Sequence, residues 1–486
     1  MSATKKNIIW SLLGNGLPLI AGIILFPKII DAYGLDQFGL LTLAWALIGY
    51  FSLFDLGLSR ALTQQISQAT SENRSPTEIA ELTRTALLVM WSLGIIGGLI
   101  LWAITPWIVV SFLKIPSDSA QASIEAFSLL AFAIPIVVHT SGLRAILEAL
   151  HEFKSASLIR TFMGVGTFLG PYLSSFVSTS LTSPIVALIV LRLFTWGMHI
   201  IAVHKTQILA VPHRVFDAAW LKPLFQFGGW MTVSNIIGPF LYYLDRFFIA
   251  SILGASAAAL YVAPYEIITK MLIVPTAISG VLFPIFAKQW ANNPDDSAKK
   301  LNQGIFYSAI LLVPPSIVLC FFAPEWLGLW LGSAFSETGP AVVTWLSIGI
   351  LFNSAAQIIF SKVQGAARSD WTAKLHIAEL IPYLGLLWIC LNSWGIVGAA
   401  FAWTARVFID LLGLMYFGKR INPLNLSIIK PGLAFVSLFA FFLLLSLINL
   451  SLNMRIGVIC FGLAIYVVCS LAYIRKDGRL HWLKIS

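Results

Sequence analysis

The sequence predicts an all-α protein that crosses a membrane about fourteen times, as two six-helix lobes followed by two further helices. Three observations predict this fold class: an apolar composition, a series of long apolar stretches and an uneven distribution of Lys and Arg. Hydrophobic residues make up 58% of the 486-residue chain and charged residues only 11%, whereas a soluble protein carries about 25% charged residues. The apolar excess therefore has to face lipid.

Fourteen apolar stretches are each long enough to form a membrane-spanning helix, for which about 20 residues are needed. Their centres lie near Leu19, Leu47, Gly97, Pro135, Leu169, Val190, Pro239, Pro275, Leu311, Leu351, Leu384, Val407, Phe439 and Leu463. Strands are not expected, because the strands of membrane barrels alternate apolar and polar residues and these stretches do not. The predicted helices are numbered one to fourteen in chain order.

The positive charges fall mainly on one side of this predicted topology. If the N-terminus is cytoplasmic, the cytoplasmic segments hold 24 of the 31 Lys and Arg residues. The opposite segments hold only Lys28, Lys114 and Arg455. This asymmetry is the positive-inside pattern of membrane proteins, so both termini are predicted to be cytoplasmic. It also accounts for the net charge of +10 without a nucleic-acid partner.

An internal repeat relates the two predicted lobes. Residues 10–40 align with residues 230–260 without a gap at an offset of 220 positions. The aligned identities are Trp10 with Trp230, Asn15 with Asn235, Ile29 with Ile249, Gly34 with Gly254 and Leu40 with Leu260. Six predicted helices separate the copies. Because six is even, both copies enter the membrane in the same direction, which is typical of a parallel repeat.

The repeat and the charge pattern divide the chain into four predicted parts. Residues 1–205 form an N-lobe of helices one to six, 206–224 a linker, 225–420 a C-lobe of helices seven to twelve, and 421–486 helices thirteen and fourteen with a cytoplasmic tail. The linker mixes apolar residues such as Phe216 and Trp220 with charged ones. This pattern predicts an amphipathic helix along the cytoplasmic interface.

Ionisable residues inside the predicted helices are the candidate functional residues, because each costs roughly 2.5–3.5 kcal/mol to insert and usually faces a cavity. The basic candidates for substrate binding are Arg144, Arg192, Arg246, Lys270 and Arg406. The acidic candidates for ion coupling or cavity lining are Asp55, Asp245, Glu266 and Asp410.

Some of these residues have an opposite charge four positions away and could neutralise it on the same helix face. These pairs are Arg144 with Glu148, Glu266 with Lys270, and Arg406 with Asp410. Arg192 has no acid within four residues, so we expect it and Arg246 to face a cavity. Asp55 has two alternatives: pairing with Arg60, or bonding the backbone where Gly57 weakens the helix.

Several enzymatic features are missing from the sequence. It contains no Gly-x-x-x-x-Gly-Lys-Ser/Thr phosphate loop and no His, Cys and carboxylate cluster at metal-ligand spacing. No cofactor and no metal are therefore expected. The longest external segments, near 114–123 and 325–340, are too short to carry a catalytic domain, so the chain is not expected to be an enzyme.

Three motifs resemble those of Wzx-type polysaccharide flippases in the multidrug/oligosaccharidyl-lipid/polysaccharide exporter superfamily. They are Gly34-Leu35-Asp36-Gln37-Phe38-Gly39, Phe54-Asp55-Leu56-Gly57-Leu58-Ser59-Arg60-Ala61, and Leu244-Asp245-Arg246-Phe247-Phe248-Ile249 with the following Tyr261, Pro264, Tyr265 and Lys270. The resemblance implies two lobes around a central cavity. It further implies that undecaprenyl-diphosphate-linked oligosaccharide, such as an O-antigen unit, moves from the cytoplasmic to the periplasmic leaflet by alternating access. Lys270 matches the family's basic cavity residue on helix eight, and Asp245 the acid of helix seven.

The resemblance also sets the expected location, partners and alternatives. The location is a bacterial inner membrane, and the partners are lipid-linked oligosaccharide, membrane lipid, a polysaccharide polymerase and chain-length proteins. One alternative is a drug or cation antiporter of the same superfamily, whose cavity would favour acidic groups. Others are a polytopic glycan-assembly enzyme, which needs a larger external loop, and a flippase of lipid-linked peptidoglycan precursor.

Overall fold

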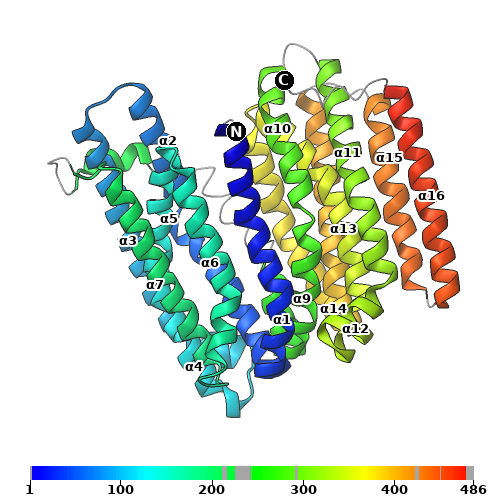
Figure 1. Cartoon of the computed structure of the whole chain (residues 1–486), viewed down its shortest axis with the longest axis horizontal. Helices are drawn as coiled ribbons and strands as arrows, with labels where there is room; N and C mark the ends of the chain where they lie inside the picture. Colours follow the sequence, from blue (N-terminus) through cyan, green and yellow to red (C-terminus); the bar gives the residue numbers. More distant parts are fainter. Residues whose placement is uncertain are drawn as a thin grey trace. The chain divides into compact units, whose positions relative to one another are not determined.

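The structure is a computed structural model that describes residues 3–210, 216–224, 241, 243–289, 294–421, 426–448 and 450–477. The regular structure in these ranges is helical, and no strand occurs among them. The chain divides into two compact units, Met1–Ala259 and Leu260–Ser486. Figure 1 traces the helices in chain order.

The first unit contains the helices that precede residue 260. They are α1 (Ala3–Tyr50), the 3₁₀ helix η1 (Phe51–Asp55), α2 (Leu58–Ser71), α3 (Pro76–Trp107), the π-helical turn η2 (Ile108–Phe112), α4 (Ser117–Ala131), α5 (Ala133–Ala149), α6 (Phe153–Ser174), α7 (Thr182–Lys205), the 3₁₀ helix η3 (Ala218–Trp220), helical residues 243–253 and the start of α9 (Ala255–Lys270). The packing of α1 on α6 and of α3 on α5 is the most extensive between helices of this unit.

The second unit contains most of α9 and the helices after it. They are α10 (Ile273–Gln289), α11 (Pro294–Phe321), α12 (Ala323–Leu331), α13 (Ser333–Gly365), α14 (Ser369–Ile421), α15 (Leu426–Leu443), the 3₁₀ helix η4 (Leu444–Leu447) and α16 (Leu452–Asp477). Helix α13 packs on α14, α10, α12, α11 and α15. It therefore forms the centre of this unit, and most of its length is buried.

Three glycines mark the turns between predicted helices. Gly34 (φ 75°) interrupts α1, Gly254 (φ 93°) precedes α9, and Gly395 (φ 57°) interrupts α14. A positive φ is strained for residues with a Cβ and is readily adopted by glycine. Each long helix is therefore two helices joined at a sharp bend, which matches the predicted turns between helices one and two and between helices eleven and twelve.

Two pairs of positions that the predicted repeat aligns lie among the described residues of the first unit. Gly34 and Gly254 both have a positive φ and both separate two helices. Asp36 and Ser256, which are also 220 positions apart, hydrogen bond to each other through their side chains. These features agree with the predicted repeat, which stays a prediction. The aligned residues Trp230 and Asn235 lie outside the described residues.

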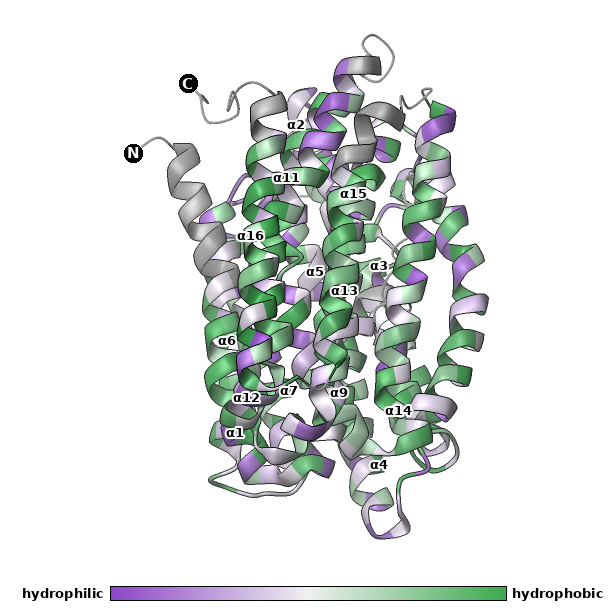
Figure 2. Ribbon diagram, turned by 90° about the vertical axis from the view of Figure 1, so that its right-hand side faces the viewer, coloured by the Kyte–Doolittle hydropathy of each residue, from purple (hydrophilic) through white to green (hydrophobic). Residues whose placement is uncertain are grey.

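Hydrophobic residues, coloured green on the ribbon in Figure 2, make up most of the length of many helices. Many of the large ones are exposed. Trp102 is 56% exposed, Ile381 79% and Leu329 91%. Soluble proteins rarely expose contiguous apolar surface on this scale, so these faces are suited to acyl chains. Nine helical segments of the described chain are long and apolar enough to cross a membrane. The all-α polytopic fold class is confirmed, whereas the count of fourteen spans stays a prediction.

The predicted linker is only partly described, because residues 211–215 are not. Its described part contains η3 and the helical residues 221–224, and it packs against α3. Arg84 donates to the Leu209 carbonyl at 3.4 Å, and the Thr85 hydroxyl accepts from the Asp217 amide at 3.0 Å. The four predicted parts and the interfacial position of the linker stay predictions.

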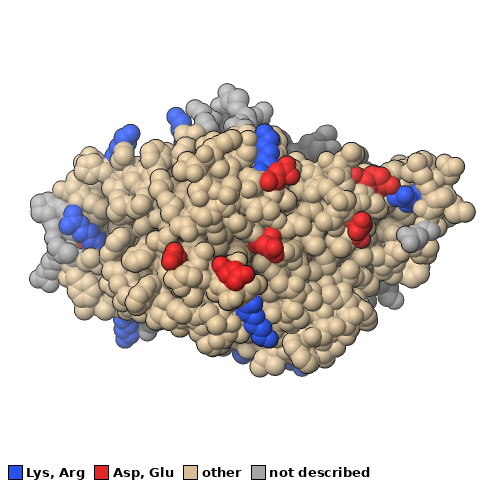
Figure 3. Space-filling view, turned by 90° about the horizontal axis from the view of Figure 1, so that it is seen from below, with Lys and Arg blue, Asp and Glu red and all other residues tan. Residues whose placement is uncertain are grey.

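One end of the helices is shown in space-filling form in Figure 3. The surface visible there is mostly uncharged, and the acidic and basic side chains on it are scattered. That face offers no continuous basic surface of the kind that binds a nucleic-acid backbone.

Candidate functional site

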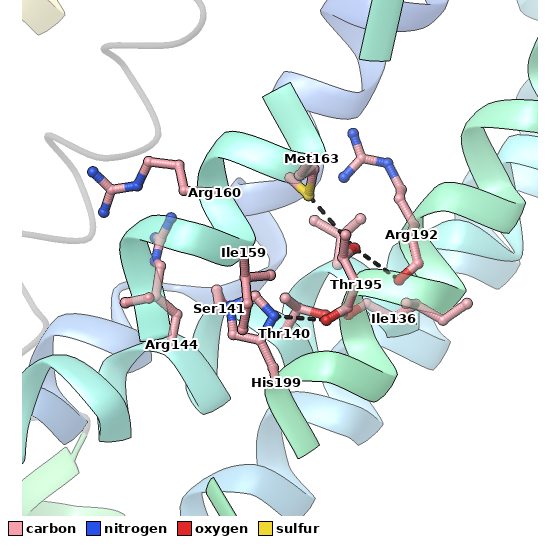
Figure 4. A pocket seen from close by; sticks show the side chains of 12 residues that line it. Ile136, Thr140, Ser141, Arg144, Ile159, Arg160, Met163, Arg192, Thr195 and His199 are labelled. Atoms are coloured by element: carbon pink, nitrogen blue, oxygen red, sulfur yellow. Dashed lines mark hydrogen bonds between the residues drawn. The ribbon is translucent and has the colours of Figure 1, made fainter. Parts of the chain in front are cut away.

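A cavity of about 140 Å³ lies between α5, α6 and α7 of the first unit. Its described lining includes the polar residues Thr140, Ser141, Arg144, Arg160, Arg192, Thr195 and His199. In Figure 4 the three arginines come from three different helices, α5, α6 and α7. The cavity is therefore a cationic site, rich in hydroxyl groups, that no single helix could form.

Arg192 is the most buried arginine of this cavity. It is 9% exposed, its Nε atom has no hydrogen-bond partner in the described chain, and no ion pair to it occurs there. Thr195 and His199 lie on the same face of α7, because spacings of three and seven residues return to one side of a helix. The Thr195 hydroxyl donates to the Leu191 carbonyl at 2.9 Å and contacts the Met163 sulfur at 3.6 Å. The Arg192 guanidinium thus keeps donor capacity for an anion.

Arg144 and Arg160 share one carboxylate at the edge of the cavity. The Glu148 Oε1 atom lies 3.7 Å from Arg144 Nε and 3.4 Å from Arg160 Nη2. All three side chains are partly exposed, so these ion pairs are weak. The predicted Arg144–Glu148 contact is present, but one acid cannot balance three arginines. The site keeps an excess of positive charge.

Asp245 and Arg246 are both almost completely buried on the helical residues 243–253. The Arg246 guanidinium carbon lies 5.0 Å from the Tyr243 ring centre, a cation–π contact. Asp245 Oδ1 accepts from the Arg246 backbone amide at 2.8 Å. Among the described residues that line the cationic cavity, Arg246 is absent. The sequence-based hypothesis of one cavity shared with Arg192 and Lys270 therefore stays a hypothesis.

Lys270 pairs with Glu266 in α9. Lys270 Nζ lies 3.0 Å from Glu266 Oε2, and half of the lysine side chain is exposed. The two charges are four residues apart, so they neutralise each other on one helix face. In this structure Lys270 satisfies an acid of its own helix.

The two halves of α14 bring a second group of charges together. Gly398 lies so close to Cys390 that an added Cβ would be 2.0 Å from the Cys390 oxygen, so the halves fold back on each other. Asp410 Oδ1 lies 3.5 Å from His376 Nε2, and the Arg406 guanidinium carbon lies 5.8 Å from the Tyr383 ring centre.

The predicted pairing of Arg406 with Asp410 does not form an ion pair in the described chain. Asp410 pairs with the first half of α14 instead. Because the bend at Gly395 places His376 opposite Asp410, the nearest partner comes from across the hairpin and not from the next helical turn.

Asp55 organises the junction between η1 and α2. Its carboxylate accepts from the Gly57 amide at 2.7 Å, from the Ser59 hydroxyl at 2.7 Å and from the Ser141 hydroxyl of α5 at 3.3 Å. Of the two alternatives for Asp55, the backbone contact is the one present, and Arg60 is exposed. The contact with the amide two residues on is an Asx turn, which fixes the backbone just before α2.

The chain is similar to known proteins in sequence and in fold. The chain matches the family model described as polysaccharide biosynthesis protein over residues 34–340. It is also 32% identical to a putative O-antigen transporter of Shigella flexneri over 417 residues, which are 85% of this chain and 97% of that protein. The chain belongs to this polysaccharide biosynthesis protein family. The resemblance to Wzx-type flippases is thereby confirmed.

Solved structures confirm the fold of this family member. An inward-facing multidrug resistance MATE family transporter of the MOP superfamily aligns with a TM-score of 0.71 at 12% identity, over 86% of this chain and 99% of that chain. The lipid II flippase MurJ in an inward closed conformation aligns with a TM-score of 0.69 at 15% identity, over 97% and 100% of the two chains. At these identities the likeness concerns the fold alone.

Sequence reasoning missed several buried or cavity-lining groups of this family member. Arg160 and His199 line the cationic cavity, Glu379 lies buried within α14, and Lys362 is fully buried in α13. The spacing of His199, seven residues after Arg192, could have placed both on one face. Glu379 stands alone in an apolar run, and the insertion cost that singled out Arg192 applies to it equally.

Proposed function

We propose that this protein flips an undecaprenyl-diphosphate-linked oligosaccharide from the cytoplasmic to the periplasmic leaflet of a bacterial inner membrane. The cationic cavity between α5, α6 and α7 carries this proposal, because three arginines and three hydroxyl side chains of these helices line it. The membership in a polysaccharide biosynthesis family supports it independently.

The chemistry of the substrate fits this cavity. A diphosphate is a multiply charged anion, and it cannot cross hydrocarbon without counter-charge. Guanidinium groups bind phosphate oxygens through paired, charge-assisted hydrogen bonds. Arg192 would hold the diphosphate at the buried end of the cavity, with the Thr140, Ser141 and Thr195 hydroxyls as further partners. Arg144 and Arg160 would exchange Glu148 for phosphate oxygens.

The excess of positive charge argues against the antiporter alternative. A carrier of cationic drugs gains from acidic groups in its cavity, whereas Glu148 is shared between two arginines at the edge of this one. The Shigella relative is named as a transporter, which favours transport over catalysis. We therefore rank the flippase above both the drug antiporter and the glycan-assembly enzyme.

Deletion of the gene tests this function directly. We expect surface glycan to be lost while the complete lipid-linked oligosaccharide accumulates on the cytoplasmic leaflet. Staining of the cell surface measures the exported glycan. Radiolabelled lipid-linked sugars are then extracted with and without treatment of the periplasmic face by a glycan-modifying enzyme, which shows in which leaflet the oligosaccharide lies. If the deletion strain lacks the assembled lipid-linked unit altogether, the protein is an enzyme of assembly and the proposal is wrong.

The proposed topology has fourteen spans with both termini in the cytoplasm. Reporter fusions after residues 34, 255 and 393 should then report a periplasmic position, and fusions after 70, 295 and 425 a cytoplasmic one. The first three follow or adjoin the bends at Gly34, Gly254 and Gly395. A reversal at any of the six positions would refute the proposed span count.

A further inference from the structure

The hairpin formed by the two halves of α14 encloses a buried carboxyl group without a donor. Glu379 is 6% exposed, and neither of its carboxylate oxygens has a hydrogen-bond partner in the described chain. An ionised carboxylate in such a position forfeits its hydration without replacement, at a cost of several kcal/mol. The carboxyl group therefore needs either a neighbouring positive charge or a bound proton.

The charges around Glu379 are unbalanced by one. Glu379 lies three residues after His376 and four before Tyr383, so the three side chains share one face of the first half of α14. From the second half, Asp410 contacts His376 and Arg406 contacts Tyr383, on either side of Glu379. If His376 is neutral, two carboxylates face a single guanidinium, which leaves one negative charge in excess. The permanent cation Arg406 already occupies the site, so a bound proton fits this arrangement better than a second bulky or divalent cation.

The same hairpin supplies a neighbour that can exchange a proton. His376 Nε2 lies 3.5 Å from Asp410 Oδ1, and the imidazole stacks on Phe360 of α13 with ring centres 5.9 Å apart. An imidazole can accept a proton on one ring nitrogen and donate one from the other. The order Glu379, Asp410, His376 thus leads from a buried acid to a partly exposed base.

We propose that Glu379 and Asp410 form a proton-exchange site that binds one proton between them and exchanges it through His376. Uptake forms one O–H bond on a carboxylate oxygen and removes the excess negative charge. Release breaks that bond, and the proton passes to the imidazole and then to water. Coupling of this exchange to substrate movement rests on the proposed flippase function, whereas the proton binding does not.

The charge change acts where the two halves of the hairpin are closely packed. An added Cβ on Gly413 would be 2.6 Å from Leu375, next to His376, so the halves have little room between them. With both acids ionised, Glu379 and Asp410 repel each other across this contact. Protonation removes the repulsion and favours the closed hairpin, so a proton changes the packing of α14 about its bend at Gly395.

Other titratable groups lie around the hairpin, and their titration must be distinguished from that of Glu379. Lys362 is the buried charged residue of α13, the helix that packs on α14, and its Nζ atom has no hydrogen-bond partner in the described chain. Tyr383 lies beside Arg406. The ring centre of Tyr265 in α9 lies 6.0 Å from that of Trp403, and Trp403 lies about one helical turn before Arg406.

Infrared difference spectroscopy of the full-length protein in lipid nanodiscs tests the site without any transport substrate. The difference spectrum between acidic and alkaline buffer should contain the band of a buried carboxylic acid, which appears when the buffer is acidified. We expect Glu379→Gln to abolish this band, Glu379→Asp to keep it with a shifted midpoint, and Lys362→Met to leave a titrating band. The matched control is Glu337→Gln, an exposed acid of the same unit, which should leave the band unchanged.

Two results would overturn the proton site. One is a band that is identical in the wild-type protein and in Glu379→Gln of normal abundance and unfolding temperature. The other is a band that responds to NaCl at constant pH but not to choline chloride, which would assign the site to sodium.

A transport assay separates this inference from the proposed function. In proteoliposomes, a pH gradient should speed flipping by the wild-type protein and have no effect on Glu379→Gln. A gradient effect that survives in Glu379→Gln would refute the coupling. Failure of the wild-type protein to flip lipid-linked oligosaccharide, with the infrared band intact, would refute the proposed function and leave the proton site standing.

Discussion

Replacing Arg192 by methionine separates an anion-binding role from a structural one. Methionine keeps an unbranched apolar stem of similar length and removes only the guanidinium. Because Arg192 has no ion pair in the described chain and is 9% exposed, its removal breaks no salt bridge. We therefore expect the free energy of unfolding to stay unchanged or to rise slightly, since a buried charge is lost.

The same replacement should weaken anion binding strongly. A hydrogen bond to a charged group contributes about 1.5–3 kcal/mol, which corresponds to roughly a 10- to 150-fold change in dissociation constant. Arg192→Lys should fall between wild type and Arg192→Met, because the charge survives but the paired donor geometry does not.

Binding of radiolabelled farnesyl diphosphate to the nanodisc-embedded protein measures this effect, with the unfolding temperature recorded in parallel. Arg60→Met, an exposed arginine of α2 in the same unit, is the matched control and should bind like wild type. Equal binding by Arg192→Met and wild type would refute the phosphate role. A lower unfolding temperature that is restored by replacing a nearby acid would instead assign Arg192 a structural role.

Three further predictions follow from contacts in the first unit. Asp55→Ala should lower the free energy of unfolding by about 3 kcal/mol and reduce export only in proportion to abundance, because it leaves the buried Gly57 amide without its acceptor; export lost at normal abundance would contradict this. Asp245→Asn should keep farnesyl diphosphate binding, and it should keep the effect of a pH gradient on flipping in liposomes, because the proposed proton site lies at Glu379 and Asp410; loss of that effect would assign the proton coupling to Asp245. Gly254→Val should destabilise the protein by about 2 kcal/mol, because a β-branched residue is strained at φ 93°; an unchanged unfolding temperature would refute this.

The helical architecture could be predicted from the sequence because lipid imposes a simple rule on it. Every backbone polar group in the bilayer must be bonded internally, so long apolar stretches become helices. The turns could also be predicted, since Gly34, Gly254 and Gly395 lie between apolar stretches, where the chain must reverse its direction. The number of spans was harder to fix, because bends at these glycines join neighbouring helices into segments as long as α14.

The candidate sites could be predicted only in part, because they depend on which helix faces are opposed. Arg144 with Glu148 and Lys270 with Glu266 are local pairs, which a spacing of four residues predicts correctly. Asp410 finds His376 across a hairpin, and Arg160 reaches Glu148 twelve residues away. Contacts of that kind can be predicted only if the packing of the two helices is known, and the periodicity of the sequence does not reveal which helix faces are opposed.

The hydrogen bond between Asp36 and Ser256 has a consequence for how the repeat can be encoded. In a dimer of identical six-helix subunits, a residue at this position would meet its own copy. Two aspartates would then bring like charges together, and two serines would lack the carboxylate acceptor. The donor and the acceptor can differ only if each copy has its own codon, which two copies joined in one chain provide and a dimer of a single gene product does not.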